Sequence, residues 1–222
     1  MFDQFCVGTT LEESQTVVQK LKASKIDSCL NYSIEGIDSE AGFDQALKQI
    51  LQTIEASSVE KGTSFAVIKP TGFGSTALFE KVSSKIALSA PENLEFARIQ
   101  NRVNAICKAA NIAGAPVFID AEESWIQEAI DNLANQMMVL YNKEKAIVYN
   151  TYQLYRKDRL TYLKKSFEVA EQLNYFLGAK LVRGAYMEKE RNRAIEKNYP
   201  SSSLPSPSPS PPFRCSAKKP SR

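Results

Sequence analysis

Two cations flank a short apolar segment near the carboxyl end of the sequence, in the run Lys180-Leu181-Val182-Arg183-Gly184-Ala185-Tyr186. Side chains alternate faces along a strand, so Lys180 and Val182 point to one face and Leu181 and Arg183 to the other. Cations around the end of an apolar strand suit an anionic or electron-rich ligand at the carboxyl edge of a sheet. An ordinary strand whose flanking cations are solvated is the alternative interpretation.

Three earlier apolar segments also end in a polar side chain. Lys69 follows Ala66-Val67-Ile68, Asp120 follows Phe118-Ile119, and Gln153 follows Tyr152. If these segments are parallel strands, their carboxyl ends meet at one edge of the sheet. The sequence then predicts a site in which cations, a carboxylate and an amide lie close together.

Composition excludes several other kinds of site. The sequence has no histidine, which rules out a Ser-His-Asp triad, a His-ligated metal and an imidazole base in this polypeptide. Its four cysteines (Cys6, Cys29, Cys107 and Cys215) form no Cys-x-x-Cys pair, so they indicate free thiols in a reducing compartment. No apolar run is long enough for a membrane helix, and no targeting segment is recognisable.

The net charge of +3 is concentrated in the last residues. Residues 198–222 contain four basic side chains and no acidic one, which leaves 24 basic and 25 acidic residues in residues 1–197. The main part of the chain therefore has a net charge of −1 and lacks the basic surplus typical of nucleic-acid binding.

Strand-like and helical segments alternate along residues 11–197. Strands are predicted near residues 26–33, 64–69, 116–120, 146–152 and 179–183. Helices are predicted near residues 11–23, 39–57, 75–88, 93–111, 124–141, 156–176 and 187–197. This alternation favours an α/β architecture with a parallel sheet.

Both an open doubly wound sheet and a barrel fit the alternation. No Gly-x-Gly-x-x-Gly follows the first strand, which counts against a dinucleotide site of the Rossmann type. Polar residues at successive strand ends favour a (β/α)8 barrel, whose strand ends converge on one face. Eight units need about 250 residues, so we expect an incomplete barrel of about five β/α units.

The composition changes sharply after Tyr199. Seven of the ten prolines lie from Pro200 onward, alternating with serine. Such a segment favours disorder or polyproline II structure, so we expect a partial barrel domain over residues 1–199 and a basic, disordered tail over residues 200–222. A polyproline II segment can also dock in an aromatic groove, and this alternative stays open.

Four motifs in this order resemble the proline dehydrogenase family. They are Ala66-Val67-Ile68-Lys69, Phe118-Ile119-Asp120-Ala121-Glu122-Glu123, Tyr149-Asn150-Thr151-Tyr152-Gln153, and Lys180 to Tyr186 followed by Glu190-Arg191. The resemblance implies a (β/α)8 barrel with non-covalently bound FAD. It further implies oxidation of L-proline to Δ1-pyrroline-5-carboxylate, a step of proline catabolism, with electrons passed to a quinone.

The resemblance also assigns roles around the reacting atoms. Asp120 matches the family's active-site aspartate, and Lys180 matches a cation near flavin N5; both are expected to be catalytic. Lys69 is expected near the substrate carboxylate and the flavin, and Tyr186 as an aromatic wall of the substrate pocket. Cations of this kind stabilise the negative charge of a reduced flavin.

A second set of residues is expected to contact the cofactor. The backbone of Ala121 is expected close to the flavin, and the Gln153 amide is expected to hydrogen-bond the isoalloxazine edge. Arg183, Gly184 and Ala185 match the segment that lies against the phosphate-bearing part of FAD. Arginine suits phosphate because its planar fork can bind two oxygens at once.

The resemblance fades just after Tyr199, so the chain is expected to lack the family's last three strands, which supply further substrate and flavin contacts. An alternative from another class is therefore a non-catalytic chain, either an unstable barrel fragment or an interaction fragment. Peripheral membrane association is expected if the resemblance holds. Bacterial family members are cytoplasmic or peripheral to the inner membrane, and eukaryotic ones are mitochondrial. A third alternative, an aldolase or isomerase with a Schiff base on Lys69, remains open.

Overall fold

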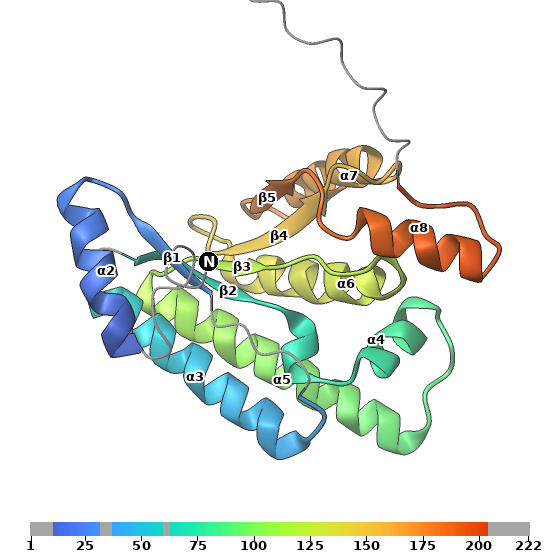
Figure 1. Ribbon diagram of the computed structural model, residues 1–222, viewed down its shortest axis with the longest axis horizontal. Coiled ribbons are helices and arrows are strands. Elements are labelled where there is room, and N and C mark those ends of the chain that lie inside the picture. The colour runs from blue at the N-terminus through green and yellow to red at the C-terminus, as the bar shows by residue number, and fades with distance from the viewer. Residues whose placement is uncertain (1–10, 32–36, 60–62, 204–222) are drawn as a thin grey trace, which may run out of the picture.

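The computed structural model describes residues 11–31, 37–59 and 63–203, and its core is a parallel sheet of five strands (Figure 1). The strands are β1 (Ser28–Asn31), β2 (Thr63–Ile68), β3 (Val117–Ile119), β4 (Val148–Gln153) and β5 (Ala179–Val182). They lie side by side in sequence order, and every neighbouring pair is parallel. All five strands predicted from the sequence are confirmed.

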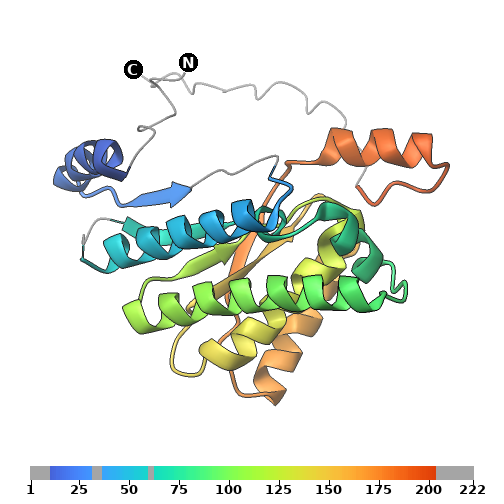
Figure 2. The same ribbon diagram turned by 90° about the horizontal axis from the view of Figure 1, so that it is seen from below.

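The helices also occur where the sequence predicts them. They are α2 (Leu11–Ala23), α3 (Glu40–Val59), α4 (Thr76–Ser83), α5 (Ala90–Ala113), α6 (Ser124–Tyr141), α7 (Arg159–Gln172) and α8 (Met187–Glu196). A short 3-10 helix, η1 (Pro70–Phe73), follows β2. In Figure 2, α3, α5, α6 and α7 form a layer against the sheet, whereas α2 and α8 lie outside this layer.

The boundaries of the longest helix follow from its sequence. At the start of α5, the Glu92 carboxylate accepts from the backbone N–H and the hydroxyl of Ser89, in a capping box. At its end, Gly114 adopts a left-handed conformation with φ of 67°, which glycine tolerates best. These two signals fix where α5 begins and ends between β2 and β3 in the sequence.

Alternation along the strands divides the sheet into two faces. Ala66, Ile68, Val117, Ile119 and Val148 belong to the buried core that packs against the helices. The residues between them therefore point to the opposite face. The core fixes the register of β2, β3 and β4, and through this register it fixes which side chains share the opposite face.

The expected fold class is confirmed at the level of an α/β fold with a parallel sheet and helices between consecutive strands. The predicted tail falls mostly on residues 204–222, which lie outside the described residues. Just before them, the backbone N–H of Lys157 donates to Ser202 (3.1 Å), and Ser203 forms a β-bridge with Arg156.

Candidate active site

The face of the sheet opposite the helical layer carries an aromatic cluster at its centre. Phe65 of β2 and Phe118 of β3 stack with ring centroids 4.2 Å apart and planes inclined by 5°. Tyr149 of β4 meets both rings edge-on, at 5.6 and 5.5 Å. These rings form an apolar floor beneath the side chains that follow at the strand ends.

Lys180 and Asp120 meet above this floor. The Lys180 ammonium lies 2.5 Å from Asp120 Oδ1 and 5.0 Å from the centroid of the Phe118 ring. Both side chains stay in contact with solvent, with exposed fractions of 28% and 19%. Two of the sequence-predicted catalytic residues therefore form one ion pair.

Neighbouring groups fix this ion pair. Thr151 of β4 lies between the two partners in the sheet, and its hydroxyl hydrogen-bonds Ile119 O at 2.8 Å and lies 3.5 Å from Asp120 Oδ1. The backbone N–H of Asp120 donates to Ile68 O at 2.8 Å. Sequence analysis did not select Thr151, although its place in the motif on β4 could have suggested it.

The charge of this ion pair also reaches Cys29 on β1. Partial burial raises the pKa of the Cys29 thiol, the Lys180 ammonium lowers it, and the Asp120 carboxylate raises it to a smaller extent. The thiol is solvent-accessible and lies 3.5 Å from Phe65 O. Cys29 therefore reports on the position of Lys180, a role that sequence analysis did not foresee.

Glu122 joins the loops that follow β2 and β3. Its carboxylate accepts from the backbone N–H of Thr71 at 3.1 Å and from the Thr71 hydroxyl at 2.6 Å. Burial raises the pKa of Glu122, while the Thr71 donors and the nearby Lys69 ammonium partly oppose this rise. Lys69 and Glu122 thus lie within electrostatic reach of each other at the strand ends. Pro70, which follows Lys69, begins η1 and is buried.

Gln153 is held by protein partners on both ends of its amide. Nε2 donates to Glu122 O at 2.5 Å and to the Tyr155 hydroxyl at 2.8 Å, while Oε1 accepts from Arg156 at 3.2 Å. The side chain is buried, with 1% exposed. Its expected hydrogen bond to a cofactor edge stays a prediction, and such a bond requires the remaining acceptor capacity of Oε1 or a rearrangement.

The segment after β5 lies open to solvent. Arg183, Gly184 and Ala185 are exposed, and Tyr186 is half-buried. Burial raises the pKa of the Tyr186 hydroxyl, and the Glu122, Glu123 and Asp120 carboxylates raise it further. Arg183 forms no ion pair with any described residue. Tyr186 therefore lies within electrostatic reach of Asp120, whereas the Arg183 guanidinium is available to a ligand.

Helix α8 is anchored at the edge of the site. The buried Glu190 carboxylate accepts from the backbone N–H and the hydroxyl of Ser124 at 2.5 Å, and from Ser202 at 2.9 Å. Glu190 thus accepts a backbone N–H at the start of α6 that has no partner within the helix. The N-cap residue of this helix is Glu123. The Arg193 guanidinium lies 4.1 Å from the ring centroid of Trp125.

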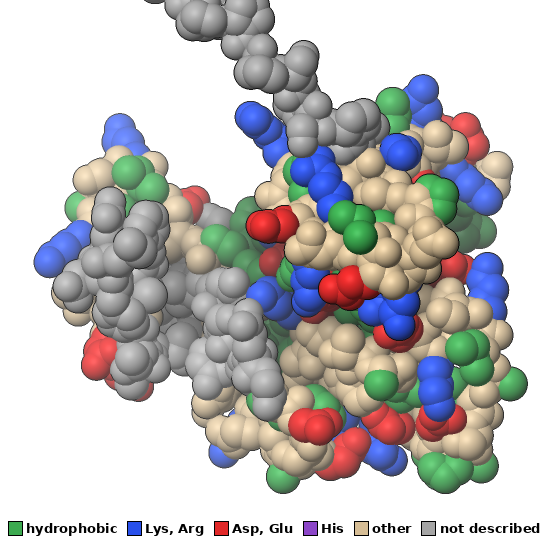
Figure 3. All heavy atoms as spheres, turned by 45° about the vertical axis from the view of Figure 1, so that its right-hand side comes forward, with side chains coloured by type: hydrophobic (Ala, Val, Ile, Leu, Met, Phe, Trp, Pro, Cys, Tyr) green, Lys and Arg blue, Asp and Glu red, His purple; other side chains and the backbone are tan. Residues whose placement is uncertain are grey.

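Acidic and basic side chains are interleaved on the face that includes α8, with no large area of one sign (Figure 3). Within residues 11–31, 37–59 and 63–203, no group of three or more His, Cys, Asp or Glu residues could hold a metal ion. No helix in the described part of the chain has the length and apolarity needed to cross a membrane.

Comparisons with known proteins give a consistent assignment. A family model described as "Proline dehydrogenase" matches residues 14–206. The chain is 38% identical over 184 residues to the carbapenem antibiotics biosynthesis protein CarD of Pectobacterium carotovorum subsp. carotovorum, covering 83% of this chain and 49% of that protein. It is 31% identical over 240 residues to the mitochondrial proline dehydrogenase 1 of Dictyostelium discoideum, covering 90% and 42%. The chain thus spans about half the length of these relatives.

Solved structures resemble the fold of this chain. Proline utilization A (PutA) from Bdellovibrio bacteriovorus, inactivated by N-propargylglycine, matches with a TM-score of 0.78 at 15% identity, covering 90% of this chain and 22% of that one. PutA from Corynebacterium freiburgense matches with a TM-score of 0.69 at 14% identity, covering 85% and 19%. At such identities the likeness concerns the fold, which is a curled, parallel half-barrel of five strands. The complete eight-stranded barrel stays a prediction.

Proposed function

Because the chain belongs to the proline dehydrogenase family, we propose that its strand ends contribute to FAD-dependent oxidation of L-proline to Δ1-pyrroline-5-carboxylate. The observation that carries this proposal is the Lys180–Asp120 ion pair, which lies at 2.5 Å on an aromatic floor at the carboxyl edge of the parallel sheet. Ligands bind at this edge in α/β folds.

The residues present fit a flavin chemically. Lys180 is a partly exposed cation, and an exposed Arg183 follows it beside the exposed backbone of Gly184 and Ala185. A cation near the ring system and a guanidinium near phosphate oxygens are the donors that an anionic dinucleotide needs. Bound FAD would supply the two-electron acceptor for this oxidation.

Oxidation of proline removes two electrons and two protons. A hydride, which carries both electrons and one proton, leaves the carbon next to nitrogen, the nitrogen gives up the second proton, and a C=N bond results. The Lys180 ammonium, paired with Asp120, would stabilise the negative charge that gathers on the electron acceptor. Asp120 is held in place by the hydrogen bond from its backbone N–H to Ile68 O, and its carboxylate contacts the Lys180 ammonium at 2.5 Å. These residues therefore favour the state in which the electron acceptor has taken up negative charge.

Substrate contacts would come from the loops around the ion pair. We propose that Lys69 attracts the proline carboxylate, and that its place is stabilised by the Glu122–Thr71 contacts at the start of η1. Tyr186, half-buried and close to the carboxylates of the site, would form the wall of the pocket. The backbone of Ala121, buried after β3, would lie close to the flavin, and the Gln153 amide would hydrogen-bond the edge of its ring system.

Electrons would leave the site for a quinone. This acceptor and peripheral membrane association are proposals based on the family resemblance. The relative from Dictyostelium discoideum is named as mitochondrial. For a eukaryotic source of this chain we propose the same compartment, and for a bacterial source the cytoplasm or the inner membrane surface.

A non-catalytic role is favoured by one feature of the sheet. In the described part of the chain, β1 and β5 each pair on one side only, and Leu181 of β5 is 56% exposed. Open strand edges with exposed apolar side chains associate with other chains. Sedimentation separates the two candidates, since the non-catalytic role predicts concentration-dependent association without flavin binding.

The direct test of the enzymatic proposal is a dye-reduction assay with purified protein, added FAD and L-proline. We expect proline-dependent reduction in the wild type and a loss of at least about tenfold in Lys180→Met, because the stabilising charge is removed. Lys143→Met is the matched control, since Lys143 lies in the loop that precedes β4, at the amino edge of the sheet, where its ammonium contacts Leu173 O and Asn174 O. Equal rates in the wild type and Lys180→Met would contradict the role of the ion pair.

A further inference from the structure

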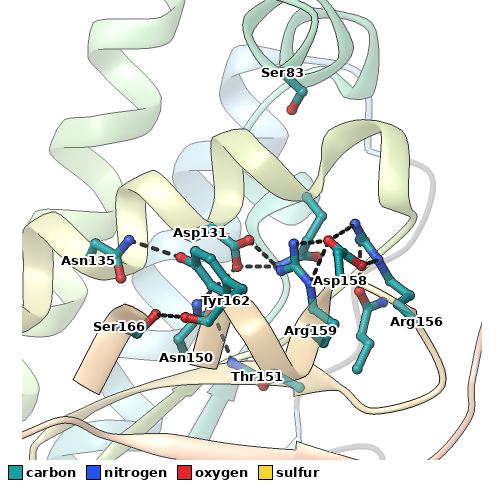
Figure 4. A network of polar contacts seen from close by, with 12 residues as sticks. Ser83, Asp131, Asn135, Asn150, Thr151, Arg156, Asp158, Arg159, Tyr162 and Ser166 are labelled. Carbon is teal, nitrogen blue, oxygen red and sulfur yellow. Dashed lines mark hydrogen bonds and ion pairs between the residues drawn. The ribbon is translucent and has the colours of Figure 1, made fainter. Parts of the chain in front are cut away.

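A buried carboxylate lies behind the site, on the helix side of the sheet. Asp131 of α6 has 3% of its surface exposed and accepts hydrogen bonds from three side chains (Figure 4). Gln127 and Asn150 each donate to Oδ1 at 2.9 Å, and Arg159 donates to Oδ2 at 2.6 Å. A charge buried this deeply is stable only when donors surround it.

The first chain of hydrogen bonds starts at Asn150 and leads through β4 to the ion pair. Asn150 faces Asp131, and its Oδ1 accepts from the backbone N–H of Thr151 at 2.8 Å. The Thr151 side chain projects to the opposite face of the sheet, where its hydroxyl donates to the carbonyl of Ile119 at 2.8 Å and lies 3.5 Å from Asp120 Oδ1. Asp131 is thus connected through two consecutive residues of one strand to the carboxylate that holds Lys180.

The second contact leads to Gln153. Arg159 bridges Asp131 and Asp158, with its Nη2 2.7 Å from Asp158 Oδ2. Arg156 in turn lies 2.9 Å from the same oxygen through its Nη2 and donates through Nη1 to Gln153 at 3.2 Å. Two buried guanidiniums therefore connect the Asp131 carboxylate to the amide at the end of β4.

The third contact leads to the loop after β3. Gln127 uses its Nε2 on Asp131, and its Oε1 accepts from the backbone N–H of Glu122 at 2.9 Å. The carbonyl of Glu122 accepts from Gln153, which closes a ring of hydrogen bonds with the second chain. Glu122 and Gln153, which meet where the two chains join, are both buried.

We propose that Asp131 is a positioning residue for the candidate active site, acting on Asp120, Gln153 and Glu122 through these three hydrogen-bond chains. This inference rests on the proposed function where it concerns the cofactor. Asp131 touches none of the residues expected to contact a ligand, so its effect passes through Asn150, Arg159 and Gln127. Supporting contacts of this kind fix the geometry of a site that would otherwise be too loose.

The chain offers a matched control for a merely structural role. Asn142, also fully buried, donates to Val148 O and Phe176 O at 2.8 Å and accepts from the backbone N–H groups of Ile147 and Val148. It lies at the other end of β4, away from the strand ends that form the site. Asn142→Ala should therefore destabilise the fold without affecting the candidate site.

The experiment compares wild type, Asp131→Asn and Asn142→Ala, each first checked for folding by circular dichroism. The readout that needs no cofactor is the rate at which iodoacetamide modifies Cys29 at about pH 8, followed on the peptide that contains this residue. In Asp131→Asn we expect Lys180, no longer fixed by an oriented Asp120, to turn towards solvent. The Cys29 thiol pKa then rises, because the lowering effect of the Lys180 ammonium is lost, and we expect modification to slow about threefold.

The second readout is FAD affinity, which we expect to fall about tenfold or more in Asp131→Asn and to stay within twofold in Asn142→Ala. Should Asp131→Asn fail to fold, Asn150→Ser interrupts the first chain alone and is expected to reproduce the slower Cys29 modification. Unchanged Cys29 modification and FAD affinity in Asp131→Asn, or equal changes in Asn142→Ala, would overturn the inference. If wild type does not bind FAD, the proposed function fails, and Cys29 modification still decides the role of Asp131.

Discussion

Replacing Gly178 with alanine should separate β5 from β4 and disturb the site at its base. Gly178 immediately precedes β5, and its carbonyl accepts from the backbone N–H of Asn150 at 3.0 Å. A Cβ atom at this position would lie 2.1 Å from Val148 O and 2.9 Å from Tyr149 Cα. Both are backbone atoms, so no side-chain rotation relieves the overlap.

The size of the effect follows from these distances. Contact at about 3.4 Å requires the two strands to move apart by roughly 1.3 Å, which stretches the 3.0 Å bond from Asn150 beyond hydrogen-bond range. Overpacking costs about 1–3 kcal/mol, and a lost hydrogen bond costs about 1 kcal/mol. We therefore expect Gly178→Ala to lower the free energy of unfolding by about 2–4 kcal/mol, or Tm by roughly 5–15 °C for a domain of this size.

Thermal unfolding followed by circular dichroism measures this effect, with Gly114→Ala as the control. Gly114 has φ of 67° and open space around its Cβ position, where the nearest atom is Lys145 Nζ at 3.7 Å. Alanine there costs about 1–2 kcal/mol of backbone strain and leaves β5 in place. A Gly178→Ala protein as stable as wild type, or no less stable than Gly114→Ala, would refute the close approach of the two strands.

Three further predictions concern single side chains. Burial raises the pKa of Glu122 in the folded state, so the stability that it contributes is present below the ordinary pKa of about 4.5 and is lost as pH rises through the raised value. In urea unfolding at pH 7, Glu122→Gln should therefore be at least as stable as wild type. A higher free energy of unfolding for wild type at this pH would contradict the prediction. Arg183→Ala should weaken FAD binding by about one to two orders of magnitude. Arg183→Lys should weaken it less, because lysine keeps the charge and loses only the planar fork of the guanidinium. Unchanged FAD affinity of Arg183→Ala in a titration would mean that Arg183 is a solvated cation. Arg156→Ala should weaken FAD binding and leave the Cys29 modification rate unchanged, because it interrupts only the contacts that lead to Gln153. A changed modification rate would contradict the separation of the chain to Gln153 from the chain to Asp120.

The strands and helices could be predicted because local patterns decide them. Apolar runs that end in Lys69, Asp120 and Gln153 marked three strand ends, and alternation placed Lys180 and Leu181 on opposite faces of the sheet.

The contacts between strand ends could not be predicted, because they depend on how far the sheet curls. Lys180 and Asp120 come from strands that are not neighbours, and their ion pair reaches across the strand that carries Thr151. Nothing in the sequence near Gln153 indicates that its amide is held by Glu122 and Arg156.

The buried charges on the helix side were also invisible in the sequence. Asp131 and Arg159 lie 28 positions apart on two different helices, and no local sequence pattern marks either of them as buried. They meet because α6 and α7 pack behind the same strand, β4, which carries Asn150. Only the tertiary structure identifies such a pair.

The most direct test of the account is an anaerobic titration of purified protein, first with FAD and then with L-proline, followed by visible absorption. We predict that the flavin spectrum changes on binding and that its visible absorbance is bleached by L-proline, while Lys180→Met binds or bleaches far less. A protein whose added FAD keeps the spectrum of the free cofactor, and is not bleached by L-proline, would contradict the claim that these strand ends form a proline-oxidising flavin site.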